Sequence, residues 1–137
     1  MDNLIDQLKR DEGWVHTAYR DQLGYLTIGC GHNLDAKGLS DRAIEIILED
    51  DIADAKFGLL GKWPWMRGLS PARLGAMVNL TFNLGTGGLG TFKKFLKAAE
   101  SGAWEMAAAE LLDSKYATQV GERAHRIARQ LKEDKWV

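Results

Sequence analysis

The sequence predicts an α+β fold, in which a small lobe of one helix and a β-hairpin is joined by a helix to a larger, mainly helical lobe. Three observations lead to this prediction. Apolar residues recur at helical spacing in residues 3–12. Residues 17–34 combine strand-forming residues with glycine-containing turns. From residue 71 onward, amphipathic segments follow one another between glycines. We expect a single domain with lobes at about 1–60 and 61–137.

The composition is that of an ordinary globular protein. The chain has 137 residues, of which 45% are hydrophobic and 27% charged, enough to bury one core. Its single cysteine, Cys30, excludes an intramolecular disulfide. The first residues have neither the basic nor the long apolar stretch of a secretory signal. We therefore expect no signal peptide, no stable membrane insertion, no cofactor and a monomer.

The net charge of −1 conceals an uneven distribution of charge. Residues 1–60 hold 6 Lys/Arg and 12 Asp/Glu, a balance of −6, whereas residues 61–137 hold 12 and 7, a balance of +5. A basic half could engage an anionic polymer such as a cell wall or a nucleic acid. We favour the simpler explanation that solvated helix faces differ in sign, since no tight Lys/Arg block is present.

The first helix should end where the first acid of interest lies. Leu4, Ile5 and Leu8 form its apolar stripe, and Gly13 is a typical residue just beyond a helix end. Glu12 is then the last helical residue, at the end where the helix dipole disfavours a negative charge. Residues 17–34 should form a hairpin or meander, with a turn at 21–24 and a loop at 33–38.

Ser40 is a good N-cap for a helix over about 41–60. Asp51 falls within the apolar stripe of that helix, where an acid needs either a partner or water. An aromatic break at 61–68 precedes Ser70-Pro71, a strong helix start. The remaining expectations are a buried helix from 71 to 85, a flexible connection at 86–90, a helix capped by Thr91, a helix at 103–113, a linker at 114–121 and a basic final helix from 122 to about 132.

Glu12 and Asp21 are candidates for paired catalytic carboxylates. Cleavage of a glycosidic bond needs one carboxyl group as acid and a second that stays ionised. Each residue also has an ordinary structural role. Glutamates at helix ends are usually exposed, aspartates commonly begin turns, and Thr27 suits a strand.

A longer sequence pattern supports a catalytic role for Glu12 and Asp21. The spacing Glu12-x8-Asp21-x5-Thr27 is followed at once by Ile-Gly-Cys-Gly-His32. This pattern resembles the active-site signature of the T4-type phage lysozymes, the endolysin muramidases of glycoside hydrolase family 24. Residues 76–85 resemble the central helix of that family, and Arg123 to Arg126 resemble part of its final helix.

The resemblance implies a lysozyme-like fold with a cleft between the lobes, and hydrolysis of the β-1,4 bond between N-acetylmuramic acid and N-acetylglucosamine. It implies Glu12 as general acid, Thr27 as the residue that holds the attacking water, and Asp21 as the second carboxylate, which either positions that water or stabilises the oxocarbenium-like transition state. A threonine that holds water beside Asp21 suggests an inverting outcome. The expected supporting or substrate-binding residues are Arg123 beside the glutamate, Asn83 in the cleft, His32 paired with Asp51, and Tyr25. The segment 34–40 is shorter than in the best-known member, which affects the outer subsites.

The implied partner is the peptidoglycan glycan strand. The protein would be made in the host cytoplasm and act in the periplasm, with release by a holin. A non-catalytic wall-binding accessory protein and a lytic transglycosylase remain as alternatives. A nucleic-acid binder is a weaker one, because no recognition motif accompanies the basic helices. No metal site is expected, since the three histidines are far apart in sequence.

Overall fold

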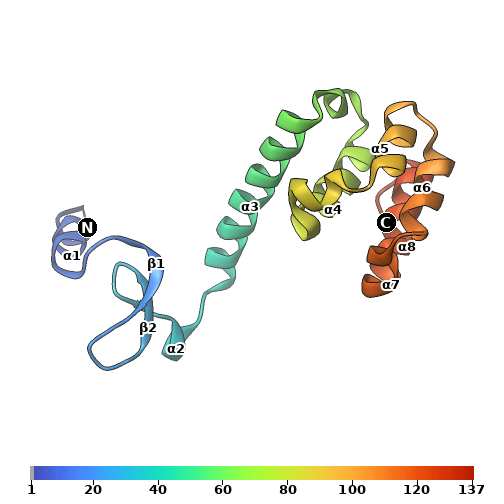
Figure 1. The fold of residues 1–137 in the computed structure, drawn as a ribbon. Helices are drawn as coiled ribbons and strands as arrows, with labels where there is room; N and C mark the ends of the chain where they lie inside the picture. The colour runs from blue at the N-terminus through green and yellow to red at the C-terminus, as the bar shows by residue number, and fades with distance from the viewer. Residues whose placement is uncertain (1) are drawn as a thin grey trace. The chain divides into compact units, whose positions relative to one another are not determined.

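The computed structural model describes residues 2–137, and their elements follow in chain order in Figure 1. The chain divides into two compact units, the first ending at Ile47 and the second comprising Leu48–Val137. The division falls inside a single helix, α3 (Asp41–Lys62). The sequence predicts the boundary between lobes later, at about residue 60. We describe each unit separately below.

Unit 1 contains one long helix, a small sheet and one short helix before α3 begins. Its elements are α1 (Asp2–Glu12), β1 (Val15–Arg20), β2 (Leu26–Gly29), β3 (His32–Asn33) and α2 (Leu34–Lys37). The three strands form an antiparallel sheet in the order β1-β2-β3. Thr27 lies in the central strand, opposite Tyr19 on one side and Asn33 on the other. The predicted meander is therefore confirmed.

The end of α1 agrees with the sequence, whereas the loop predicted at 33–38 does not. Gly13 follows Glu12 with φ +86°, and its N–H donates to the Lys9 carbonyl at 3.0 Å. The predicted loop contains α2, so that prediction is wrong. Asn33 caps α2 by accepting a hydrogen bond from the Ala36 N–H at 2.9 Å.

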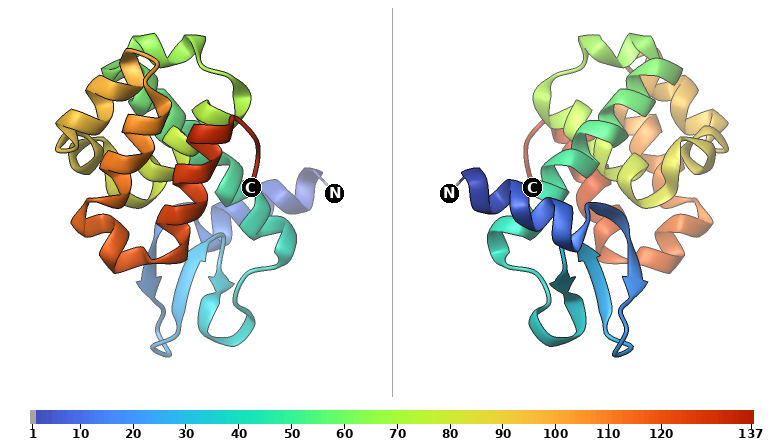
Figure 2. Two further views of the ribbon diagram at one scale, coloured as in Figure 1. Left: turned by 90° about the vertical axis from the view of Figure 1, so that its right-hand side faces the viewer. Right: turned by 90° about the vertical axis from the view of Figure 1, so that its left-hand side faces the viewer.

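Unit 2 is helical. After the C-terminal part of α3 it contains η1 (Pro64–Gly68), α4 (Pro71–Gly90), α5 (Lys93–Glu100), α6 (Trp104–Leu112), α7 (Lys115–Val120) and α8 (Glu122–Glu133). Helix α6 packs against α5, α7 and α8, and both views of Figure 2 show these helices side by side. Fully buried side chains such as Leu80, Leu111 and Leu131 fill the centre. No helix in residues 2–137 combines the length and apolar character needed to cross a bilayer.

Helix α4 begins as predicted but continues further. Ser70 caps it, accepting from the Arg73 N–H at 3.4 Å, and Pro71 is the first helical residue. At Gly85 the backbone leaves helical geometry (φ 71°, ψ 167°), and the chain then resumes a helix to Gly90. The predicted flexible connection at 86–90 is therefore wrong. Thr91 closes this helix instead of starting the next, because its hydroxyl donates to the Gly88 carbonyl at 2.7 Å.

The predicted linker at 114–121 is also wrong, because it contains helix α7. Ser114 caps α7 through the Ala117 N–H at 3.2 Å. Tyr116 is the buried residue of this helix, and its ring lies 6.2 Å from that of Phe92. A single buried aromatic side chain anchors a helix too short to show a periodic pattern.

The start of α4 is fastened to the end of α8. The Arg73 Nε donates to the Leu131 carbonyl at 2.8 Å, and its Nη1 lies 3.6 Å from the Asp134 carboxylate. The buried Gln130 amide donates to the Ala72 carbonyl at 2.7 Å. Helix ends have backbone carbonyls without helical partners. The Arg73 contact supplies a partner at the C-terminal end of α8, and both hydrogen bonds join two segments that are distant in sequence.

Candidate active site

The three predicted catalytic residues all belong to unit 1. Glu12 is the last residue of α1, Asp21 begins the turn between β1 and β2, and Thr27 lies in β2. The Glu12 side chain extends to the turn between β2 and β3. A methyl group placed on Gly31 would lie 2.9 Å from Oε2 of Glu12. The carboxyl group therefore lies directly against the backbone of that turn.

Asp21 organises the turn that it begins. Its Oδ1 accepts hydrogen bonds from the N–H groups of Leu23 and Tyr25, both at 2.9 Å. Its own N–H donates to the Tyr25 carbonyl at 2.9 Å, and its carbonyl accepts from Gly24 at 3.0 Å. No residue from 2 to 137 donates a hydrogen bond to Oδ2. One carboxylate oxygen thus holds the turn, and the other is available to a ligand or water.

Thr27 is buried, and its hydroxyl has a fixed direction. Oγ1 donates to the Tyr25 carbonyl at 2.9 Å. A hydroxyl has one proton to donate and two lone pairs. Because the proton is engaged, the Thr27 hydroxyl can only accept a hydrogen bond from a third partner. It can therefore orient a water molecule by accepting one of its protons.

Tyr25 connects these two residues through its backbone. Its N–H donates to Asp21, and its carbonyl accepts from both the Asp21 N–H and the Thr27 hydroxyl. The resemblance predicts a supporting role for the Tyr25 side chain, which is exposed. The role of its peptide groups has no signature in residue type. The positions of turn and strand, once known, would have indicated it.

His32 lies in β3, where its Nε2 is hydrogen-bonded to the Gly38 carbonyl. A carbonyl can only accept, so Nε2 carries a proton and Nδ1 is left for another partner. Asp51, its predicted partner, belongs to unit 2 and has an exposed side chain. The pairing of the two residues stays a prediction.

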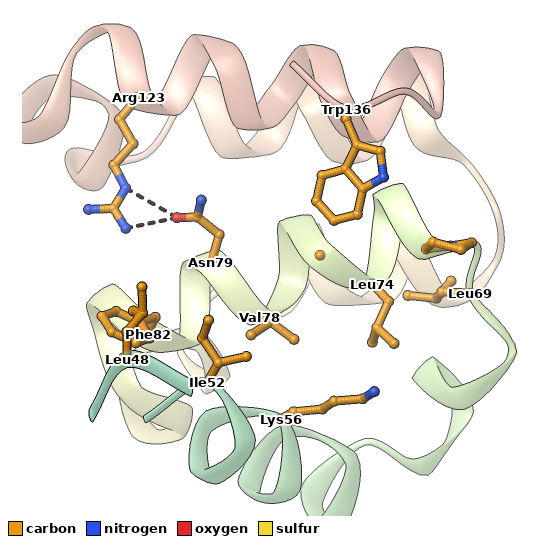
Figure 3. A pocket seen from close by; sticks show the side chains of 12 residues that line it. Leu48, Ile52, Lys56, Leu69, Leu74, Val78, Asn79, Phe82, Arg123 and Trp136 are labelled. Atoms are coloured by element: carbon orange, nitrogen blue, oxygen red, sulfur yellow. Dashed lines mark hydrogen bonds between the residues drawn. The ribbon is translucent and has the colours of Figure 1, made fainter. Parts of the chain in front are cut away.

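Arg123 lies in unit 2, on α8, where an asparagine of α4 holds it. Its Nε and Nη2 donate to Oδ1 of Asn79 at 3.2 and 2.8 Å (Figure 3). The predicted cleft residue, Asn83, is an exposed residue one helical turn further along α4. Asn79 was not among the predicted residues, although an amide within the apolar run of α4 is itself a signal.

The Arg123–Asn79 pair forms one wall of a pocket in unit 2. The pocket has a volume of about 610 Å³. Figure 3 shows Ile52, Val78 and Leu74 pointing into it, with Trp136 across from Leu74. An apolar hollow with one guanidinium group can hold an amphipathic partner.

Metal-ligating residues do not cluster in the part of the chain that the structure describes. Among residues 2–137, no three His, Cys, Asp or Glu side chains come close enough together to hold an ion.

Comparison with known proteins agrees with these features. The Phage lysozyme family profile matches residues 9–132. Probable T4-type lysozymes 1 and 2 of Dictyostelium discoideum are 27% and 29% identical to the chain, and each alignment covers 91% of both proteins. The pre-baseplate central spike protein Gp5 of Enterobacteria phage T4 is 27% identical over 91% of the chain, which corresponds to 27% of Gp5.

The match extends over most of the chain and includes Glu12, Asp21, Thr27 and Arg123. A helical protein with a small antiparallel sheet is also what the predicted lysozyme-like α+β fold requires, so that prediction is confirmed. The glycosidase assignment follows at the level of the family. The chain belongs to the phage lysozyme family and is a lysozyme-like muramidase.

Proposed function

We propose that this protein hydrolyses the β-1,4 bond between N-acetylmuramic acid and N-acetylglucosamine in peptidoglycan, with inversion at the anomeric carbon. Glu12 acts as the general acid. Asp21 and Thr27 hold the attacking water. The observation that carries the proposal is that Asp21 and Thr27 are both hydrogen-bonded to the backbone of Tyr25, Asp21 at its N–H and its carbonyl and Thr27 at its carbonyl.

Glu12 protonates the glycosidic oxygen as the bond to the anomeric carbon breaks. General acids contribute when they are held within hydrogen-bonding reach of the leaving atom. Two features support this role for Glu12. It is the last residue of a helix, so its backbone is fixed, and its carboxyl group lies against the Gly31 turn.

The water molecule needs two acceptors and a free lone pair. Oδ2 of Asp21 and Oγ1 of Thr27 are both available as acceptors. A water that donates one proton to each directs its lone pair elsewhere, toward the anomeric carbon. Asp21 then takes a proton as the new C–O bond forms. An inverting enzyme leaves room for this water, with carboxyl groups roughly 6.5–9.5 Å apart.

Other residues have supporting roles in this proposal. Arg123 orients the catalytic glutamate, and Asn83 and Tyr25 contact the sugar. His32 stabilises the segment after β3, as its bond to the Gly38 carbonyl supports. We propose further that the protein is made in a host cytoplasm and reaches the wall with the help of a holin.

Glu12→Gln tests the assignment of the acid. The amide keeps the shape of the side chain but cannot give a proton, so lysis of purified walls should fall by about 10²–10⁴-fold. Asp11→Asn is the matched control. It removes the neighbouring charge, which pairs with Arg10 on the surface at 3.2 Å, and should leave lysis unchanged.

Both variants should unfold cooperatively and still sediment with walls. Full lysis by Glu12→Gln would overturn the assignment. A wild-type protein that binds walls but never releases soluble sugars would favour the accessory-protein alternative.

The proposed inversion at the anomeric carbon has its own test. NMR of the first reducing ends released should show the α-anomer, because water attacks from the face opposite the leaving group. A β-anomer would indicate a covalent glycosyl-enzyme, and an anhydro-sugar would indicate a lytic transglycosylase. Either result contradicts the water-holding roles of Asp21 and Thr27.

A further inference from the structure

Gly29 and Gly31 flank Cys30. Gly29 is the last residue of β2 and Gly31 lies in the turn between β2 and β3, yet their φ angles are nearly the same. Their φ angles are +70° and +71°, which side chains other than glycine rarely adopt. Their surroundings differ. A methyl group on Gly29 would meet no atom within 4 Å, whereas one on Gly31 would meet Oε2, Cδ and Cγ of Glu12 at 2.9, 3.3 and 3.4 Å.

The contact with Glu12 is part of a larger one between the turn and α1. The Cys30 thiol donates to the Leu8 carbonyl at 3.3 Å, one helical turn before Glu12. The turn is therefore attached to the last turn of α1 at two neighbouring points. One is a hydrogen bond to the backbone, and the other is the packing of the Glu12 side chain on Gly31.

We propose that Gly31 is a positioning residue for Glu12, because its missing side chain leaves the space that the Glu12 carboxyl group occupies. A carbon atom 2.9 Å from Oε2 is closer than van der Waals contact. Any side chain at residue 31 would therefore move the carboxyl group away from the turn. The catalytic meaning of this inference rests on the proposed function, in which Glu12 is the general acid.

Comparison of Gly31→Ala with Gly29→Ala separates the requirement for a positive φ from the requirement for space beside Glu12. Both variants place alanine at a positive φ, so both should lower Tm, and Gly31→Ala should lower it somewhat more because its methyl group also meets Glu12. Only Gly31→Ala should lower kcat, by at least about 10-fold, with little change in KM, since small displacements of a catalytic group are costly. The pH profile of kcat should change shape in Gly31→Ala alone. Equal losses of kcat in both variants, or full kcat in Gly31→Ala, would overturn the inference.

A second measurement needs no activity. Glu12→Ala removes the atoms that the new methyl group would meet. The fall in Tm caused by Gly31→Ala should therefore be smaller in the Glu12→Ala background than in the wild type. The fall caused by Gly29→Ala should be the same in both backgrounds. If Gly31→Ala costs the same Tm in both, Glu12 does not occupy this space and the inference fails, whatever the result of Glu12→Gln lysis.

Discussion

Thr27 donates its hydroxyl proton to the carbonyl of Tyr25 at 2.9 Å, which leaves the hydroxyl able only to accept. Thr27→Ser keeps this oxygen, and Thr27→Val keeps the shape without it. We expect Ser to retain most wall lysis and Val to lose it. Val should also destabilise the fold by about 0.5–1.5 kcal/mol, because the Tyr25 carbonyl loses one of its two hydrogen-bond donors and keeps the Asp21 N–H.

The measurement is kcat for wall lysis together with chemical unfolding. Equal activity of the two variants, at temperatures where both are folded, would remove Thr27 from the water-holding role.

Asp21 has two separable tasks, holding a turn and acting on water. Asp21→Asn keeps an oxygen that can accept from the Leu23 and Tyr25 N–H groups, whereas Asp21→Ala does not. We expect Asn to keep nearly normal stability and Ala to lose roughly 1–2 kcal/mol. Both should lose most lysis, since neither has a carboxylate to take the proton. Denaturant titration reports the role of Asp21 in the turn, and a lysis assay reports its role in catalysis. An active Asp21→Asn variant would contradict the proposed action of Asp21 on water.

Arg123 and Asn79 should be energetically coupled. Each alanine variant removes the same two hydrogen bonds, so their stability costs should fall short of additivity by about 0.5–1.5 kcal/mol in a double-mutant cycle. Asn83→Ala combined with Arg123→Ala is the matched control and should be additive. Coupling to Asn83 in place of Asn79 would contradict the contact described here.

Gly85 and Gly87 lie close together in α4 but differ in backbone geometry. Gly85 has φ 71° and ψ 167°, a region open almost only to glycine, so Gly85→Ala should cost about 1–3 kcal/mol. Gly87 is helical with open space around it, and Gly87→Ala should stabilise by about 0.5–1 kcal/mol. If Gly85→Ala lowers the unfolding free energy and Gly87→Ala raises it, the kink is confirmed. If both substitutions raise it, the result argues against the kink.

The Tyr116 hydroxyl is buried without a hydrogen-bond partner among residues 2–137. Tyr116→Phe should therefore be neutral or stabilising at pH 7, by up to about 2 kcal/mol. Burial raises the pKa of Tyr116, an effect that the nearby Arg123 charge only partly opposes.

The raised pKa also predicts a dependence on pH. Above about pH 10 the unfolded chain loses the phenol proton before the folded chain does, so wild-type stability should fall as pH rises. The stability difference between Tyr116→Phe and wild type should accordingly widen from pH 9 to pH 11. A constant difference would mean that the hydroxyl ionises equally in both states.

Strong local signals in the sequence were sufficient for the long elements. Gly13, Ser40 and Ser70 each mark a helix boundary by backbone conformation or a capping oxygen, and the structure has helix ends at all three. Such signals depend on one or two residues and their immediate neighbours. They need no knowledge of tertiary contacts.

Short elements escaped prediction for a physical reason. Helices α2 and α7 have four and six residues, less than the length over which apolar periodicity can be recognised. The helical stretch after Gly85 is rich in glycine, which disfavours helix. Burial of Leu89 compensates for this, and burial follows from the tertiary fold.

The candidate site likewise has residues that local sequence predicts and contacts that it does not. Spacing and resemblance selected Glu12, Asp21 and Thr27, and the turn role of Asp21 followed from its residue type. The contacts that aim these groups could not be predicted. They involve the backbone of Tyr25 and the absent side chain of Gly31. Both depend on the register of the sheet and the position of a turn.

The attachment of Ala72 and Arg73 to Gln130, Leu131 and Asp134 has a consequence for synthesis on the ribosome. The hydrogen bonds of the unit 1 sheet lie among residues 15–33 and can form as soon as that part has emerged. The start of α4, by contrast, must wait for partners about 58 positions later in the chain. We therefore expect unit 1 to mature first and unit 2 to stay open to proteases and chaperones until α8 has been made.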